Sequence, residues 1–98
     1  MPWFALIGHD GPDGAALRKK HRPAHLEGLA ALDAEGRVRH GGPLLDEDGA
    51  PCGSVVIFEA ADLAAARDVV ARDPYVQRGV FARVELRETK PVFSGGRG

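Results

Sequence analysis

The chain has 98 residues, which is the size of one domain with a modest core. Hydrophobic residues make up 44% of it and charged residues 28%, a balance typical of a soluble folded protein and not of a disordered one. The formal net charge of −1 provides no overall positive field for nucleic acid or an anionic membrane, and the single cysteine, Cys52, excludes an internal disulfide.

The first half of the chain predicts a strand, a helix and a strand. Residues 2–8 are almost continuously apolar before a turn rich in Gly and Asp, which is typical of a strand buried on both faces. This run is far too short to span a membrane, and no basic residues precede it as in a signal peptide, so we expect a cytoplasmic protein. Residues 15–35 are predicted to be helical, as one helix or as two pieces divided at Pro23, with Gly36 as the C-terminal cap. The buried stripe of this helix is expected to consist of Leu26, Leu29 and Leu32. Residues 37–40 predict a short strand.

The second half predicts another strand, helix and strand. Residues 44–52 are acidic and contain Gly and Pro, as expected for the loop of a long hairpin. Residues 54–59 are apolar on both faces, and Asp62 is a good N-cap for a helix over residues 63–72. Residues 80–87 alternate apolar and polar side chains, which indicates a half-exposed strand.

The order β-α-β-β-α-β is that of the ferredoxin-like α+β fold, a four-stranded antiparallel sheet with two helices on one face. The first and third strands are central in this fold, and they are the two that are apolar on both faces. Because the helices cover one face, we expect a second copy of the chain to cover the other face in a homodimer. The domain is predicted to span residues 1–93, and the Gly-rich residues 94–98 to form a disordered tail.

This topology collects candidate site residues from several segments at one end of the domain, and all but one have polar side chains. They are Asp10, Arg22, His25, Gly42, Ser54, Asp73 and Tyr75. His25 and Asp73 are a candidate acid–base pair, because a carboxylate that accepts from one imidazole nitrogen leaves the other free to exchange a proton near neutral pH. Arg22 is a candidate anchor for an anionic or oxygen-rich group of a small-molecule ligand. The alternative is that His25 is a surface histidine and Asp73 a turn residue, since no short motif joins them.

Other kinds of site receive less support from the sequence. The basic run at residues 18–22 has no interleaved aromatic residues, which favours a solvated helix face over a nucleic-acid site. His21 and His25 have the spacing of metal ligands on a helix, but Pro23 lies between them and no Glu follows as in a zincin, so no metal is expected. Ser54 lacks the nucleophile elbow of a hydrolase. The glycines form no dinucleotide fingerprint, and we expect no cofactor.

Several short segments, taken in order, resemble the YciI-like (YCII-related) family over nearly the whole chain. They are Arg22-Pro23-Ala24-His25-Leu26, Glu35-Gly36-Arg37, Gly41-Gly42-Pro43, Gly53-Ser54-Val55-Val56-Ile57, Asp73-Pro74-Tyr75-Val76 and Gly79-Val80-Phe81. The resemblance implies a ferredoxin-like dimeric α+β barrel, and it assigns His25 and Asp73 to the proposed His–Asp dyad of the family. One branch of the family is similar to a dehydrochlorinase of a chlorinated hydroxyquinol, in which such a pair would assist loss of HCl.

The sequence departs from the family pattern at two positions. His9 precedes Asp10 where many members have a glutamine, and Phe81 stands where a tyrosine is common. Both changes are expected to alter the wall of the ligand pocket.

Two functions agree with these residues. The first is a small cofactor-independent enzyme in which His25 is the general acid or base, Asp73 orients it and Arg22 holds substrate charge. Its reaction would be an elimination such as dehydrochlorination, or an isomerisation, of a small organic molecule. The second is a non-catalytic dimeric module that binds a small metabolite or assists an enzyme, which the lack of a dedicated nucleophile, metal cage or cofactor motif favours.

Overall fold

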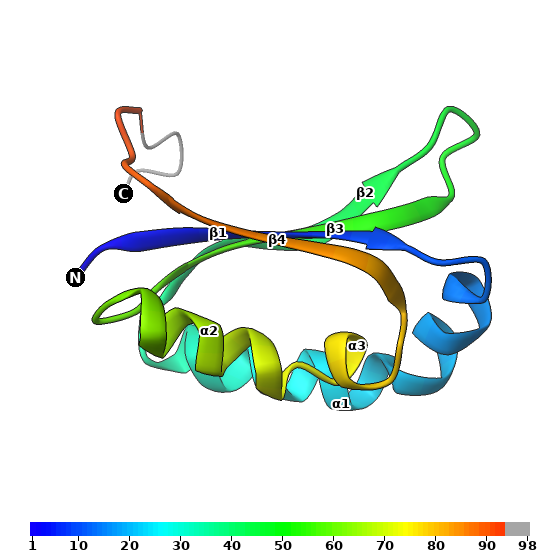
Figure 1. Ribbon diagram of the computed structural model, residues 1–98, viewed down its shortest axis with the longest axis horizontal. Helices are drawn as coiled ribbons and strands as arrows, with labels where there is room; N and C mark the ends of the chain where they lie inside the picture. The colour runs from blue at the N-terminus through cyan, green and yellow to red at the C-terminus, as the bar shows by residue number, and fades with distance from the viewer. Residues whose placement is uncertain (94–98) are drawn as a thin grey trace.

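The computed structural model describes residues 1–93, which form a four-stranded antiparallel sheet with helices packed against one face (Figure 1). The strands are β1 (Trp3–Asp10), β2 (Val38–Leu45), β3 (Pro51–Glu59) and β4 (Phe81–Thr89). The helices are α1 (Gly14–Ala34), α2 (Leu63–Arg72) and the short α3 (Pro74–Gln77). The strand order β2-β3-β1-β4 places β1 and β3 in the centre, which confirms the ferredoxin-like α+β fold. The predicted tail at residues 94–98 lies outside the described residues.

The core lies between the sheet and the helices. Antiparallel pairing of β1 with β3 sets Phe4 opposite Phe58 and Leu6 opposite Val56, and all four side chains are at most 3% exposed. Because side chains alternate along a strand, these residues share the face that the helices cover (Figure 1). From α2, Ala66 and Val70 pack against them.

The opposite face of the sheet carries apolar side chains that no helix or strand of residues 1–93 covers. The intervening residues of the central strands are half-buried: Trp3, Ala5, Ile7, Val55 and Ile57. All three helices of residues 1–93 lie on the other side of the sheet (Figure 1). This apolar open face extends over both central strands.

Helix α1 continues through Pro23 without a break. Proline in a helix interior costs about 3 kcal/mol, so packing on either side must offset that cost. The helix presents His25, Leu29 and Leu32 to the interior at the spacing of one face, whereas Leu26 is 41% exposed, so its predicted burial is wrong. Within residues 1–93, no helix is both long and apolar enough to cross a membrane.

The β2–β3 hairpin is longer than predicted. Its strands pair as far as Leu45 and Pro51, and the side chain of Asp46 accepts hydrogen bonds from the backbone N–H groups of Asp48 and Ala50 in the connecting turn. Pro43 is tolerated inside β2 because β2 is an edge strand, and its outer side needs no backbone donor.

Close packing between the central strands leads to a prediction at Gly53. A Cβ added there would lie 2.5 Å from the carbonyl oxygen of Gly8, which is backbone and cannot move aside without shifting β1. We expect Gly53→Ala to lower the free energy of unfolding by about 1–3 kcal/mol, measured by urea denaturation. Gly41→Ala is the matched control, because its Cβ would meet Leu29 at an ordinary 3.7 Å. Equal stability of the two variants would contradict this account of the packing.

Candidate active site

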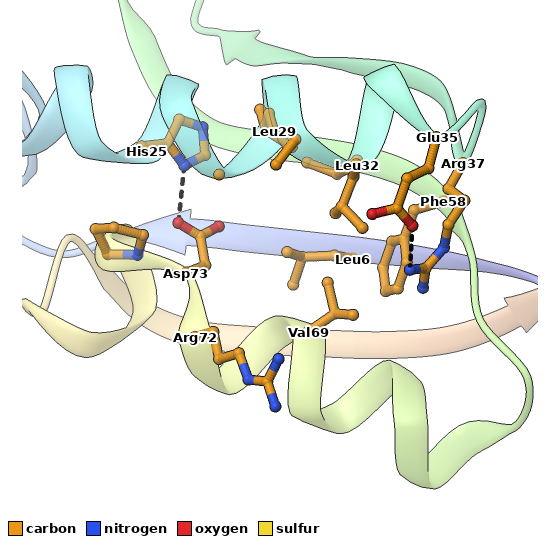
Figure 2. A pocket seen from close by; sticks show the side chains of 14 residues that line it. Leu6, His25, Leu29, Leu32, Glu35, Arg37, Phe58, Val69, Arg72 and Asp73 are labelled. Atoms are coloured by element: carbon orange, nitrogen blue, oxygen red, sulfur yellow. Dashed lines mark hydrogen bonds and ion pairs between the residues drawn. The ribbon is translucent and has the colours of Figure 1, made fainter.

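His25 and Asp73 are 48 residues apart in the sequence and meet between α1 and the α2–α3 junction (Figure 2). Nδ1 of His25 donates to Oδ1 of Asp73 over 2.8 Å, and the two side chains are 9% and 12% exposed. The same Oδ1 accepts from the backbone N–H of Tyr75 at 3.0 Å, because Asp73 is the N-cap of α3 and Pro74 occupies its first turn. The helix cap therefore fixes the carboxylate that orients the imidazole.

This hydrogen bond determines the tautomer of neutral His25. With the proton on Nδ1, Nε2 carries the lone pair that can accept a proton. Figure 2 shows Nε2 on the side of the ring away from Asp73, and it forms no hydrogen bond with any residue of 1–93. Nε2 is therefore the proton-transfer atom that the geometry leaves available.

The ring of Tyr75 stacks against one face of the His25 imidazole. The two rings are stacked with centroids 3.8 Å apart and planes within 2° of parallel. Tyr75 is 3% exposed, and its hydroxyl donates to the backbone carbonyl of Arg18 at 3.3 Å. His25 is thus restrained by Asp73 at its edge and by Tyr75 at its face.

Arg18 connects α1 to several neighbouring elements around a buried ion pair. Its Nε and Nη2 donate to the two carboxylate oxygens of Asp10 at 2.6 and 2.8 Å, and Nη2 also donates to Oγ of Ser54 at 3.0 Å. The hydrogen bonds that Arg18 donates to Asp10 raise the pKa of the guanidinium above its ordinary value. The guanidinium carbon lies 5.1 Å from the ring centroid of Tyr75 and 5.8 Å from that of Phe81. Arg18 therefore ties α1 to β1, β3 and α3 beside the His25–Asp73 pair.

A cavity of about 270 Å³ lies between α1 and the β2–β3 hairpin and is lined on one side by cationic residues. Five of the predicted site residues line it: Arg22, His25, Gly42, Ser54 and Tyr75. Asp10 and Asp73 stand behind this lining, paired with Arg18 and His25. We call this cavity the polar cavity. All seven predicted residues line it or contact its lining.

Arg18 is not among the residues that the sequence predicts for the site, because it lies in the basic run expected to be a solvated helix face. Arg22 is exposed, as expected for that face, whereas the Arg18 side chain is 11% exposed. Helical spacing offers the missing signal, since Arg18 precedes His25 by two turns and lies one turn after Gly14. A Cβ on Gly14 would lie 2.7 Å from Oδ2 of Asp10, so glycine there lets the helix start sit directly on that carboxylate.

Neither of the two departures from the family pattern lines the polar cavity, so the expected change of its wall is not seen. Nε2 of His9 donates to Oε2 of Glu85 at 2.9 Å, and this hydrogen bond lowers the pKa of Glu85. The ring of Phe81 packs against Gly8, where an added Cβ would lie 2.6 Å from it, and edge-on to Tyr75. Among residues 1–93, no three His, Cys, Asp or Glu side chains gather closely enough to hold a metal ion.

Burial of Tyr75 predicts a loss of stability at alkaline pH. Burial raises the pKa of the phenol, so the folded state binds this proton more tightly than the unfolded chain. The resulting stability is fully present below pH about 10 and is lost as the pH rises through the raised pKa. Tyr75 is the one tyrosine of the chain, so phenolate absorbance should show its ionisation above the ordinary pH range. In Tyr75→Phe, the free energy of unfolding measured above pH about 10 should no longer show the decrease caused by ionisation of the phenol. A phenol that ionises in the ordinary pH range would contradict the prediction.

Comparison with known proteins identifies the family. The YCII-related domain matches residues 2–90. The chain is 36% identical to an uncharacterised protein of Haemophilus influenzae, over 93% of this chain and 99% of that one. It is also 36% identical to the protein YciI of Escherichia coli O6:H1, over 92% and 98% of the two chains. A solved structure of a 5-chloro-2-hydroxyhydroquinone dehydrochlorinase from Burkholderia phenoliruptrix, in complex with 2,5-dihydroxybenzoquinone, superposes with a TM-score of 0.80 at 29% identity, covering 90% of this chain and 93% of that one. A match over nearly the whole length, in sequence and in fold, places this chain in the YCII-related domain family.

Proposed function

We propose that this protein is an enzyme that moves protons with its own His25–Asp73 pair on a small oxygenated organic molecule. The reaction would be an elimination such as dehydrochlorination, or an isomerisation. The observation that carries the proposal is the 2.8 Å hydrogen bond from Nδ1 of His25 to Asp73, which leaves Nε2 free on a ring that lines the polar cavity. Asp73 keeps the imidazole in one tautomer and stabilises the cation that forms when Nε2 takes a proton.

The charges of the polar cavity favour an anionic or oxygen-rich substrate. The guanidinium of Arg18 is matched by Asp10, so its charge is largely compensated. Lys19 and Arg22 also line the cavity and form no ion pair with the described residues. These two cations would attract a phenolate or carboxylate and hold it beside His25.

An elimination of this kind balances without a redox partner. Nε2 of His25 accepts a proton from the substrate, and the electron pair of the broken bond forms a new double bond. Chloride leaves with the electron pair of the C–Cl bond, and the imidazolium returns its proton to solvent. The similar dehydrochlorinase acts on a chlorinated ring with several oxygens, the class of molecule that a cavity with cationic walls would suit.

A panel of chlorinated and hydroxylated aromatic compounds tests the proposal. Chloride release reports elimination, and deuterium uptake from heavy water reports proton abstraction during isomerisation. We expect the wild-type protein to catalyse one of these reactions and His25→Asn to lose it. If compounds bind in the polar cavity and neither chloride release nor deuterium uptake exceeds the buffer rate, the catalytic proposal is wrong.

Ligand binding without chloride release or deuterium uptake would favour a non-catalytic, dimeric binding or accessory module. One observation supports this candidate: the hydroxyl of Ser54, which lines the polar cavity, accepts a hydrogen bond from Arg18 and is occupied in holding the fold. Ligand affinity that survives in His25→Asn would then support simple binding.

We also infer that two copies of the chain pack through the apolar open face. Ile7 and Ile57 lie half-buried on this face in a single chain, and a second copy would cover them by pairing the same surface with itself. Ile57→Glu should convert a dimer to a monomer in sedimentation experiments. Leu63→Glu, at an exposed position of α2, is the control that should stay dimeric. A monomeric wild-type protein would contradict the inference.

A further inference from the structure

A second cavity, of about 340 Å³, lies between α1 and α2 on the helix-covered face of the sheet (Figure 2). We call it the interhelical groove. Its floor and walls are formed by apolar side chains: Leu6, Val56, Phe58, Leu29, Leu32 and Val69. Ligand sites of small molecules begin at about 300 Å³ and have this kind of mainly apolar lining.

Both ends of the groove are polar, and one further cation lines it. Figure 2 shows Glu35 and Arg37 at the end opposite His25 and Asp73. Nη1 of Arg37 donates to Glu35 at 3.1 Å, so both ends hold a paired acid and base. Arg72 also lines the groove, and it forms no ion pair or hydrogen bond with the residues of 1–93. The groove therefore has one positive charge that no residue of 1–93 compensates.

A glycine keeps the wall of α1 open. Gly28 lines the groove in the interior of the helix, one turn after His25. A Cβ added there would meet no atom within 4 Å, so no close approach by another part of the chain requires glycine. Alanine would form a more stable helix at this position. What glycine provides here is free space above the apolar floor.

We propose that the interhelical groove binds a hydrophobic carboxylate, with its acyl or aryl body between Leu32 and Val69 and its carboxylate on Arg72. The planar guanidinium fork of arginine matches a carboxylate with two parallel hydrogen bonds. Burial of the ligand's hydrocarbon body against the apolar lining removes apolar surface from water, which favours binding. The groove shares His25 and Leu29 with the lining of the polar cavity, and Asp73 of the acid–base pair also lines the groove. The remaining lining residues differ between the two cavities, and the proposal does not depend on the acid–base reaction.

Titration with octanoate tests the site. Calorimetry gives its affinity, and NMR of the side-chain methyl groups locates it. We expect saturable shifts at Leu32 and Val69, and affinity for octanol lower by about tenfold because the neutral head group forfeits the charge-assisted hydrogen bonds. Arg72→Gln should weaken octanoate binding by about tenfold and leave octanol binding unchanged.

Gly28 provides the steric arm of the test. Gly28→Leu should fill the groove and abolish octanoate binding, while Gly28→Ala, which adds one methyl group, should retain it. Because the new Cβ meets no atom within 4 Å, both variants should fold, which circular dichroism checks. Three results would overturn the proposal: no binding to wild type, binding that survives in Gly28→Leu, or shifts at the methyl groups of Leu26, which lines only the polar cavity, in place of Leu32 and Val69. Chloride-release and deuterium-uptake assays of wild-type protein report on the polar cavity separately, so either proposal can fail alone.

Discussion

Replacement of His25 by asparagine is expected to lower turnover of a confirmed substrate by about 10²- to 10⁴-fold, the usual contribution of a positioned general acid–base group. The asparagine side chain occupies the positions of Cβ, Cγ and Nδ1 of histidine, but it cannot take up a proton near neutral pH. The cationic wall of the polar cavity is unchanged, so KM should move far less than kcat. Steady-state kinetics with the substrate found in the panel gives both values.

Asp73→Asn separates the charge of this residue from its hydrogen bonds. The amide oxygen of asparagine can still accept from Nδ1 of His25 and from the backbone N–H of Tyr75, and asparagine is a good N-cap. Its neutral side chain stabilises the imidazolium less, so we expect a kcat between those of wild type and His25→Asn. Glu35→Gln removes a carboxylate at the far end of the interhelical groove and serves as the matched control. Wild-type kcat in His25→Asn would show that the pair does not transfer protons in the reaction.

Local patterns predicted most of the elements, because the signals at their ends are local. Asp62 caps α2 as its side chain predicts, accepting from the backbone N–H of Ala65, and Gly36 ends α1 with a positive φ of 73°. The meeting of His25 and Asp73 was predicted from topology and from the family resemblance, since no short motif joins residues so distant in sequence. The ferredoxin-like order of strands was sufficient to bring them to one end of the sheet.

What the sequence did not predict depends on contacts between elements. The burial of Arg18 requires Asp10 to lie beneath the first turn of α1, which is a matter of how that helix seats on β1. Leu26 has helical spacing with Leu29 and is nevertheless exposed, because His25 faces the interior in its place. A buried polar residue shifts the helix face away from the one that hydrophobicity alone favours. The buried face of α1 can be recognised once Asp73 is known to be the hydrogen-bond partner of His25.

Removal of Arg18 is expected to produce the largest loss of stability. In Arg18→Leu the carboxylate of Asp10, 9% exposed in the ion pair, would remain in a largely buried position without its partner. Breaking one side of a buried pair typically costs 3–5 kcal/mol, and the small remaining exposure places the expected loss at about 3 kcal/mol. Urea denaturation at neutral pH measures this free energy of unfolding.

Arg22→Leu is the matched control, because Arg22 is an exposed arginine one turn later on the same helix. Its stability should lie within about 0.5 kcal/mol of wild type. The double variant Asp10→Leu with Arg18→Leu should recover part of the loss, because it no longer buries an unpaired charge. Equal losses in Arg18→Leu and Arg22→Leu would show that the Arg18–Asp10 pair does not hold α1 on the sheet. The hydrogen bond from the Tyr75 hydroxyl to the backbone carbonyl of Arg18 would then not depend on the Arg18 side chain.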